Sequence, residues 1–85
     1  MPGCEMARSE IRCRVKPKEK FDDESYRRKH VKGGIDLVVA CPKGHYDDEK
    51  ERCDKGMKVQ SVRFKKDKWD KEEAKDWIKG HKSLR

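Results

Sequence analysis

The chain lacks several residue types almost completely. Its 85 residues include no asparagine, no threonine and a single glutamine, Gln60, while lysine and glutamate are abundant. Enrichment in lysine and glutamate with few thermolabile amides is the compositional signal of hyperthermophilic proteins. The composition therefore predicts a thermophilic source. Intracellular proteins of such organisms are an exception to the rule that cytosolic cysteines stay reduced.

Apolar residues are also scarce. Hydrophobic residues make up 32% of the chain and aromatic residues 7%, whereas 48% are charged. A chain of this size forms one small domain whose core stabilises it only marginally. No run is long and apolar enough to span a membrane, and the N-terminus lacks the apolar core of a signal peptide. We expect a flexible stub over residues 1–10, a single domain over 11–81 and a tail over 82–85.

Motifs that would indicate an enzyme are missing. His30, His45 and His81 are scattered, and none lies beside a serine or cysteine in a nucleophile motif. There is no Walker loop and no dinucleotide-binding glycine motif. The carboxylate runs at 22–24 and 47–49 do not have the spacing of an EF-hand. We therefore predict a non-enzymatic protein with no catalytic residues.

The sequence does contain short β-type runs. Apolar and basic residues alternate strictly from residue 11 to 15, as a half-buried strand requires. Residues 26–40 are predicted to form a hairpin whose turn is the Gly33-Gly34 pair. A further strand is predicted over 57–64, and its apolar positions change face near Gln60, which indicates a bulge.

One amphipathic helix follows these strands. Asp70 is the predicted N-cap, with Glu73 completing a capping box, and Gly80 is the predicted stop. One helical stripe is expected to face the sheet; it contains Ala74, Trp77, Ile78 and His81. The predicted fold class is α+β: a small three- or four-stranded, mainly antiparallel sheet packed by one C-terminal helix.

The cysteines allow three interpretations. Cys13, Cys41, His45 and Cys53 supply the four soft ligands of a tetrahedral zinc site, although their spacing matches no standard zinc pattern. A Cys41–Cys53 disulfide would instead clip the acidic loop and stabilise the fold by about 3 kcal/mol. Free thiols are the third case, with Cys13 acting as a small core residue. We expect no cofactor, with zinc as the alternative.

The charge balance suggests a partner class. The chain has 24 Lys and Arg against 17 Asp and Glu, a net charge of +7. An excess of this sign favours a polyanion partner, most simply nucleic acid, whereas the interleaved acids also fit a merely solvated surface. Arginines beside an aromatic residue hold single strands by phosphate contact and base stacking. The predicted nucleic-acid-binding residues are Arg12, Arg14, Arg27, Arg28, Arg63, Lys65, Lys66, Lys68 and Tyr26.

The C-terminal part carries a family resemblance. Residues 59–81 read as a Val-Gln-Ser strand, a Phe-x-Lys-x-Lys-Trp junction and a Glu-Glu-Ala-x-x-Trp-Ile helix. This pattern resembles a small uncharacterised module of phage, provirus and archaeal virus proteins. Further matching positions, among them Ile11, Phe21 and the Cys-Pro-Lys-Gly turn at 41–44, extend the resemblance over residues 11–81. It implies a mobile-element context and supplies no catalytic residue. With no membrane span or signal peptide predicted, we expect the protein in the cytoplasm of a host cell or associated with a virion.

Three functional hypotheses follow. The first is a small basic module that binds DNA or RNA electrostatically through the sheet face without the helix. The second is a protein-interaction or structural module of a viral assembly, favoured by the acidic loop at 47–51, whose charges would repel a phosphate backbone. The third is a regulator stabilised by zinc or by a disulfide.

Overall fold

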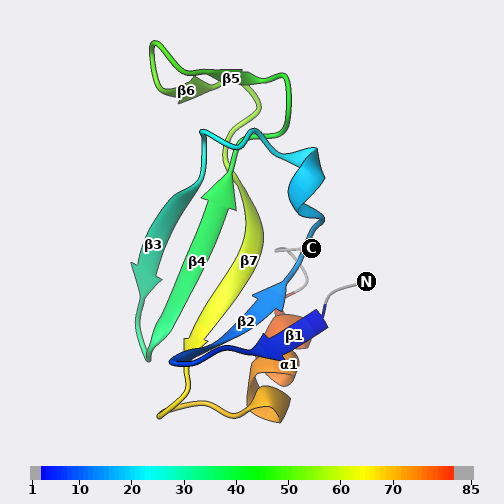
Figure 1. Cartoon of the computed structure of the whole chain (residues 1–85), viewed down its shortest axis with the longest axis vertical. Coiled ribbons are helices and arrows are strands. Elements are labelled where there is room, and N and C mark those ends of the chain that lie inside the picture. Colours follow the sequence, from blue (N-terminus) through cyan, green and yellow to red (C-terminus); the bar gives the residue numbers. More distant parts are fainter. Residues whose placement is uncertain (1–2, 82–85) are drawn as a thin grey trace.

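The computed structural model describes residues 3–81, which form an antiparallel sheet, a separate short hairpin and one helix (Figure 1). The strands of the sheet are β1 (Gly3–Met6), β2 (Glu10–Arg14), β3 (Arg27–Val31), β4 (Ile35–Ala40) and β7 (Lys58–Lys65). The hairpin contains β5 (Tyr46–Asp47) and β6 (Arg52–Cys53), η1 (Lys18–Lys20) is a single 3-10 turn, and the helix is α1 (Lys71–Gly80). The order in the sheet is β1-β2-β7-β4-β3.

The predicted α+β class is confirmed, with one difference at the N-terminus. The sheet has five strands rather than three or four, because Gly3–Met6 pairs with β2 as an edge strand. A flexible stub over residues 1–10 is therefore wrong for this segment. Cys4 lies directly opposite Cys13 and is joined to it by a disulfide, which attaches β1 to the sheet. Residues 1–2 of the predicted stub and the predicted tail at 82–85 lie outside the described residues.

The central hairpin and the bulge form where the sequence predicts them. β3 and β4 pair antiparallel across the turn at Gly33 and Gly34, which have φ values of 78° and 77°. Such positive φ angles suit glycine because it has no Cβ. The register between β4 and β7 shifts where Ser61 pairs with Val38 but Val59 pairs with the next residue of β4, so Gln60 is the extra residue of the bulge.

The helix is capped as predicted. The Asp70 side chain accepts a hydrogen bond from the backbone N–H of Glu73 at 2.8 Å, and the Glu73 carboxylate accepts one from the Asp70 N–H at 3.1 Å. Ala74 and Ile78 are buried against the sheet. His81, predicted to share this stripe, is exposed and stacks on Trp77 with ring centroids 3.8 Å apart. The described part of the chain has no helix long and apolar enough to cross a membrane.

The core lies between α1 and one face of the sheet. Its side chains are the inward members of the alternating strands and two helix residues: Ile11, Cys13, Val15, Ile35, Val62, Phe64, Ala74 and Ile78. Phe64 is at its centre, with Trp69 and Trp77 packed 5.1 and 5.7 Å from its ring. The indole N–H of Trp69 donates to the Gly33 carbonyl at 2.7 Å and thereby connects the start of the helix to the central turn.

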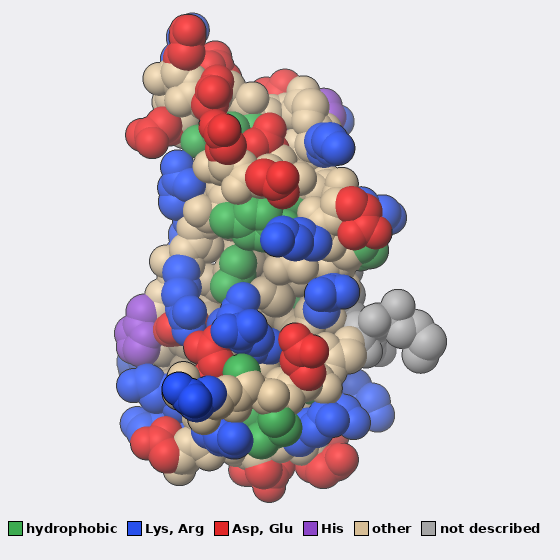
Figure 2. All heavy atoms as spheres, in the orientation of Figure 1, with side chains coloured by type: hydrophobic (Ala, Val, Ile, Leu, Met, Phe, Trp, Pro, Cys, Tyr) green, Lys and Arg blue, Asp and Glu red, His purple; other side chains and the backbone are tan. Residues whose placement is uncertain are grey.

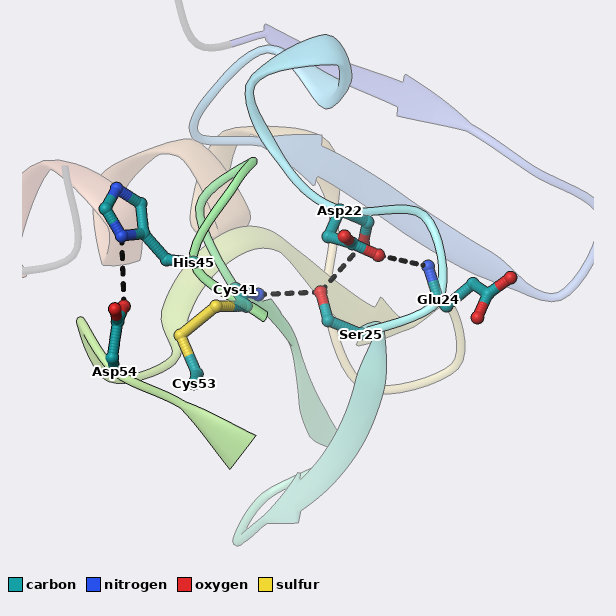
Figure 3. Close-up of a disulfide and its surroundings, with 7 residues drawn as sticks. All are labelled: Asp22, Glu24, Ser25, Cys41, His45, Cys53 and Asp54. Atoms are coloured by element: carbon teal, nitrogen blue, oxygen red, sulfur yellow. Dashed lines mark hydrogen bonds and ion pairs between the residues drawn. A yellow bond between two sulfur atoms is a disulfide. The ribbon is translucent and has the colours of Figure 1, made fainter. Parts of the chain in front are cut away.

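The acidic loop expected at 47–51 contains the turn of the short β5–β6 hairpin, which extends beyond the end of the sheet (Figure 1). A Cys41–Cys53 disulfide, the predicted pair, joins the hairpin to the end of β4 (Figure 3). The hydroxyl of Ser25 accepts a hydrogen bond from the buried Cys41 N–H at 2.8 Å and donates one to the Asp22 carbonyl at 2.7 Å. This end of the molecule is thus held by a disulfide and by the hydrogen bonds of one buried serine.

Candidate nucleic-acid interface

The face of the sheet without the helix carries rows of polar side chains. α1 lies behind β1 and β2 in Figure 1, so the near face of the sheet is open. Across that face, Arg12 of β2 lies opposite Arg63 of β7, which lies opposite Asp36 of β4. The next row consists of Arg14, Ser61 and Val38. Directly paired side chains project from the same face about 5 Å apart, so these residues form one surface.

A hollow of about 770 Å³ lies over these rows. Its cationic lining consists of Arg12, Arg14, Lys18 and Arg63, and Tyr26 lines it from the segment before β3. Figure 2 shows this face: basic side chains gather across its middle, whereas acidic side chains concentrate on the β5–β6 hairpin at the top of the view. Four of the predicted binding residues, three arginines and the tyrosine, therefore line one hollow.

Glu10 holds three arginines beside this hollow. Its carboxylate accepts hydrogen bonds from Arg63 at 2.6 Å, from Arg28 at 2.9 Å and from Arg12 at 3.2 Å. Burial by itself raises the pKa of Glu10, but the three hydrogen bonds outweigh it and lower that pKa from 4.5 to about 2. The carboxylate is therefore ionised at neutral pH, and it positions the guanidinium groups while cancelling part of their charge.

Asp36 forms the second acidic centre of the face. It pairs with His30 at 2.8 Å and with Arg28 at 2.7 Å. The hydrogen bond from His30, followed by the one from Arg28, lowers the pKa of Asp36. Arg28 therefore binds two carboxylates, Glu10 and Asp36, and the hydrogen bonds to both raise its own pKa. Among the predicted arginines, Arg28 is therefore the one whose positive charge is neutralised most by carboxylates of the protein.

Tyr26 is the aromatic residue of the hollow. Its hydroxyl donates a hydrogen bond to the Lys18 carbonyl at 3.3 Å, and its ring packs against Phe21 with centroids 6.3 Å apart. Burial, followed by the nearby charge of Asp23, raises the pKa of the phenol. This ring is partly exposed and lines the hollow, so it adds aromatic surface there.

The other predicted cations lie apart from the hollow. Arg27 contacts Glu51 and the Tyr46 hydroxyl on the hairpin, at 3.6 and 3.2 Å. Lys65 and Lys66 line a second, smaller hollow beside Glu10. Lys66 also donates a hydrogen bond to the Ala7 carbonyl, and the stem of Lys68 packs over Gly34. Arg28 lines this second hollow together with Lys65 and Lys66, while Arg27 and Lys68 belong to other surfaces.

The proposed set of four metal ligands is not brought together. Cys13 is bonded to Cys4 in the sheet, and Cys41 is bonded to Cys53 near the hairpin, so neither sulfur pair is available as thiolate. His45 instead pairs with Asp54 at 3.0 Å (Figure 3). Among residues 3–81 no group of three or more His, Cys, Asp or Glu side chains has a metal-binding arrangement. The zinc interpretation of these four residues is therefore wrong for this structure.

Two further side chains of this face, Glu10 and Ser61, are not singled out by any pattern in the sequence. Glu10 stands at the alternating position before Arg12 and Arg14, a spacing that could have placed it on the same face. Ser61 has 5% of its surface exposed, and its hydroxyl has no hydrogen-bond partner among the described residues. Only its environment makes Ser61 unusual, because a serine next to the bulge has no distinctive sequence signal.

Comparison of the chain with protein family models, with curated proteins and with solved structures gives no match. The side chains of the open face are therefore the basis for assigning a function.

Proposed function

We propose that this protein is a non-enzymatic module of viral or proviral origin that binds nucleic acid through the open face of its sheet. The observation that carries the proposal is the convergence of Arg12, Arg14 and Arg63 with Tyr26 around one hollow. Guanidinium groups donate hydrogen bonds to phosphate oxygens, and an adjacent aromatic ring stacks on a base. These contacts read phosphate and base shape, so little base specificity is expected.

Arg14 and Lys18 contribute most of the available charge. Arg12 and Arg63 each donate one hydrogen bond to Glu10, whereas Arg14 has no ion pair within the described residues 3–81. A guanidinium has five N–H donors, so Arg12 and Arg63 keep donors for a phosphate after binding Glu10. Lys18, which also lines the hollow, has no ion pair among these residues either, so the surface carries two unpaired cations beside two partly neutralised arginines.

The proposal is tested by fluorescence anisotropy with labelled single- and double-stranded DNA and RNA, each titrated at low and at physiological salt. Affinity should fall as salt rises, because neutralised phosphates release counterions. The double variant Arg12→Gln/Arg14→Gln should bind more weakly, and its log–log salt slope should be shallower by about one for each phosphate that the variant no longer neutralises. Lys71→Gln/Lys75→Gln, on the exposed face of α1, is the control with the same charge change. Binding that is absent, or indifferent to ionic strength, would refute the proposal.

A protein-interaction role is the second candidate, and the β5–β6 hairpin favours it. Exposed Asp47, Asp48 and Glu49 lie on a projection that a disulfide attaches to the sheet. Such a charged, pre-organised projection suits a basic protein partner. Self-association detected by sedimentation, in protein that binds none of the four nucleic acids, would favour this candidate.

We further propose the cytoplasm of a host cell, or a virion within it, as the site of action. Two disulfides in the described chain require that bonded cysteines persist there, which intracellular proteins of hyperthermophiles permit. Fractionation of the producing organism, combined with alkylation of thiols in the fresh lysate, tests this. Unmodified cysteines in the cytoplasmic or virion fraction are expected, whereas recovery of the protein from the membrane fraction or as free protein outside the cell would contradict it.

A further inference from the structure

Two buried polar atoms at the floor of the hollow have no partner. The Ser61 hydroxyl and Nε of Arg63 are inaccessible to solvent and make no hydrogen bond among the described residues. Both belong to β7, two positions apart, and so lie on the same face of the sheet, beneath the hollow that both residues line. Buried polar atoms are paired in more than about nine cases in ten, and an unpaired one costs about 1–3 kcal/mol. A ligand that accepts two hydrogen bonds would satisfy both once the side chains that cover them move aside.

The flanking residues make that ligand an anion. Arg14 lies directly opposite Ser61, and Arg12 lies directly opposite Arg63. Two unpaired donors on β7 and two guanidinium groups on β2 thus form a four-membered array of hydrogen-bond donors. Phosphate matches such an array, because its oxygens accept several charge-assisted hydrogen bonds and guanidinium groups bind it in a forked geometry.

Carboxylates surround the array. Glu5 and Asp23 line the same hollow on opposite sides, one from β1 and the other from the segment before β3. Glu10 and Asp36 bound it toward the other end of the sheet. A phosphate chain leaving the array in any of these directions meets negative charge, which repels it. This arrangement suits one isolated phosphate better than a track of several.

We propose that Ser61, Arg63, Arg12 and Arg14 form a binding site for a single phosphate group at the floor of the open sheet face. Val38 and Tyr26 line the same hollow and provide apolar and aromatic surface for the base or sugar attached to that phosphate. The phosphate is the terminal group of a nucleic-acid strand or that of a free mononucleotide. Its identity as part of a nucleic acid rests on the proposed function, whereas the anion site itself does not.

The site is tested by NMR with the isotope-labelled full chain, titrated with inorganic phosphate at constant ionic strength and with chloride as the reference anion. The backbone N–H of Ser61 and the Nε–H of Arg63 should shift and saturate with phosphate but not with chloride. Ser61→Ala should weaken phosphate binding about tenfold, the effect of losing one hydrogen bond to a charged group. It should leave thermal stability unchanged or higher, because the native hydroxyl has no partner among the described residues. Ser9→Ala, an exposed serine outside the hollow, is the matched control.

The source of the phosphate is tested with oligonucleotides of one sequence carrying a 5′-phosphate or a 5′-hydroxyl, and with adenosine 5′-monophosphate against adenosine. Preference for the phosphorylated strand supports a strand end, and saturation by the mononucleotide alone supports a free nucleotide. Phosphate titrations without saturable shifts at Ser61 and Arg63, or with equal affinity for Ser61→Ala and wild type, would overturn the site. Those outcomes would leave the nucleic-acid proposal intact if strands still bound in a salt-dependent way. Conversely, saturable phosphate binding without any binding of strands would refute the nucleic-acid proposal and leave the phosphate site intact.

Discussion

Replacing Glu10 by glutamine should lower stability and raise nucleic-acid affinity at the same time. The substitution keeps the size of the side chain but removes the charge that binds Arg12, Arg28 and Arg63. A native pKa of about 2, against an ordinary 4.5, corresponds to about 3 kcal/mol of stabilisation by the ionised carboxylate at neutral pH. Arg12 and Arg28 have half of their side-chain surface exposed, so solvent screens part of this. We expect a loss of about 1–3 kcal/mol.

The pH dependence of this loss has a definite sign. Because the native pKa of Glu10 lies below the unfolded value, its contribution is complete above the unfolded pKa of 4.5 and disappears as the pH falls toward about 2. The stability of wild type should therefore fall in this range, and the difference between wild type and Glu10→Gln should shrink with it.

The measurement is urea or thermal unfolding of wild type, Glu10→Gln and Glu49→Gln between pH 7 and pH 2. Glu49 is an exposed glutamate of the hairpin without an ion pair within the described residues, so its substitution controls for the loss of one negative charge. Each kcal/mol corresponds to about 4–8 °C in melting temperature for a domain of this size. A difference between wild type and Glu10→Gln that stays constant across this pH range, or matches Glu49→Gln, would refute the assigned role of Glu10. Unchanged or weaker strand binding by Glu10→Gln would refute its charge-cancelling effect.

Two further predictions concern the scaffold. Asp70→Ala removes the N-cap and should lower the unfolding free energy by about 1 kcal/mol, measured by urea denaturation. An unchanged unfolding free energy would mean that the capping box does not stabilise the fold. Cys41→Ser/Cys53→Ser removes a loop closure between residues 12 apart in sequence and should cost about 3 kcal/mol in the same assay. At a temperature where the double-serine variant is folded, it should bind phosphate with the affinity of wild type, because neither cysteine lines the hollow. A changed phosphate affinity would mean that the hairpin influences the phosphate site.

Much of the fold could be predicted from short-range patterns. The capping box at Asp70 and Glu73 needs only residues of one helical turn, and the Gly33-Gly34 turn needs only positive φ angles. The alternation of apolar and basic residues in β2 places Arg12 and Arg14 on the face opposite Cys13 in any sheet. These features depend on neighbours in the chain, so the sequence was sufficient for them.

The candidate site depended more on tertiary contacts. Arg27 and Arg28 are adjacent and have the same side chain, yet Arg28 faces Glu10 on the open surface and Arg27 contacts the hairpin. Strand alternation places the two side chains on opposite faces, but composition alone could not say which of them lies on the open face. Ser61 became a candidate only when its hydroxyl proved to be buried without a partner among the described residues.

The sequence by itself determined the α+β class, the central hairpin, the bulge at Gln60 and the capped helix, because local backbone and side-chain preferences suffice for each. The tertiary structure alone decided that Gly3–Met6 is a strand, that Cys4 pairs with Cys13, and that Glu10 binds arginines as far away in sequence as Arg63. Contacts of this kind depend on which strands become neighbours. That choice reflects the burial of the whole core rather than any single segment.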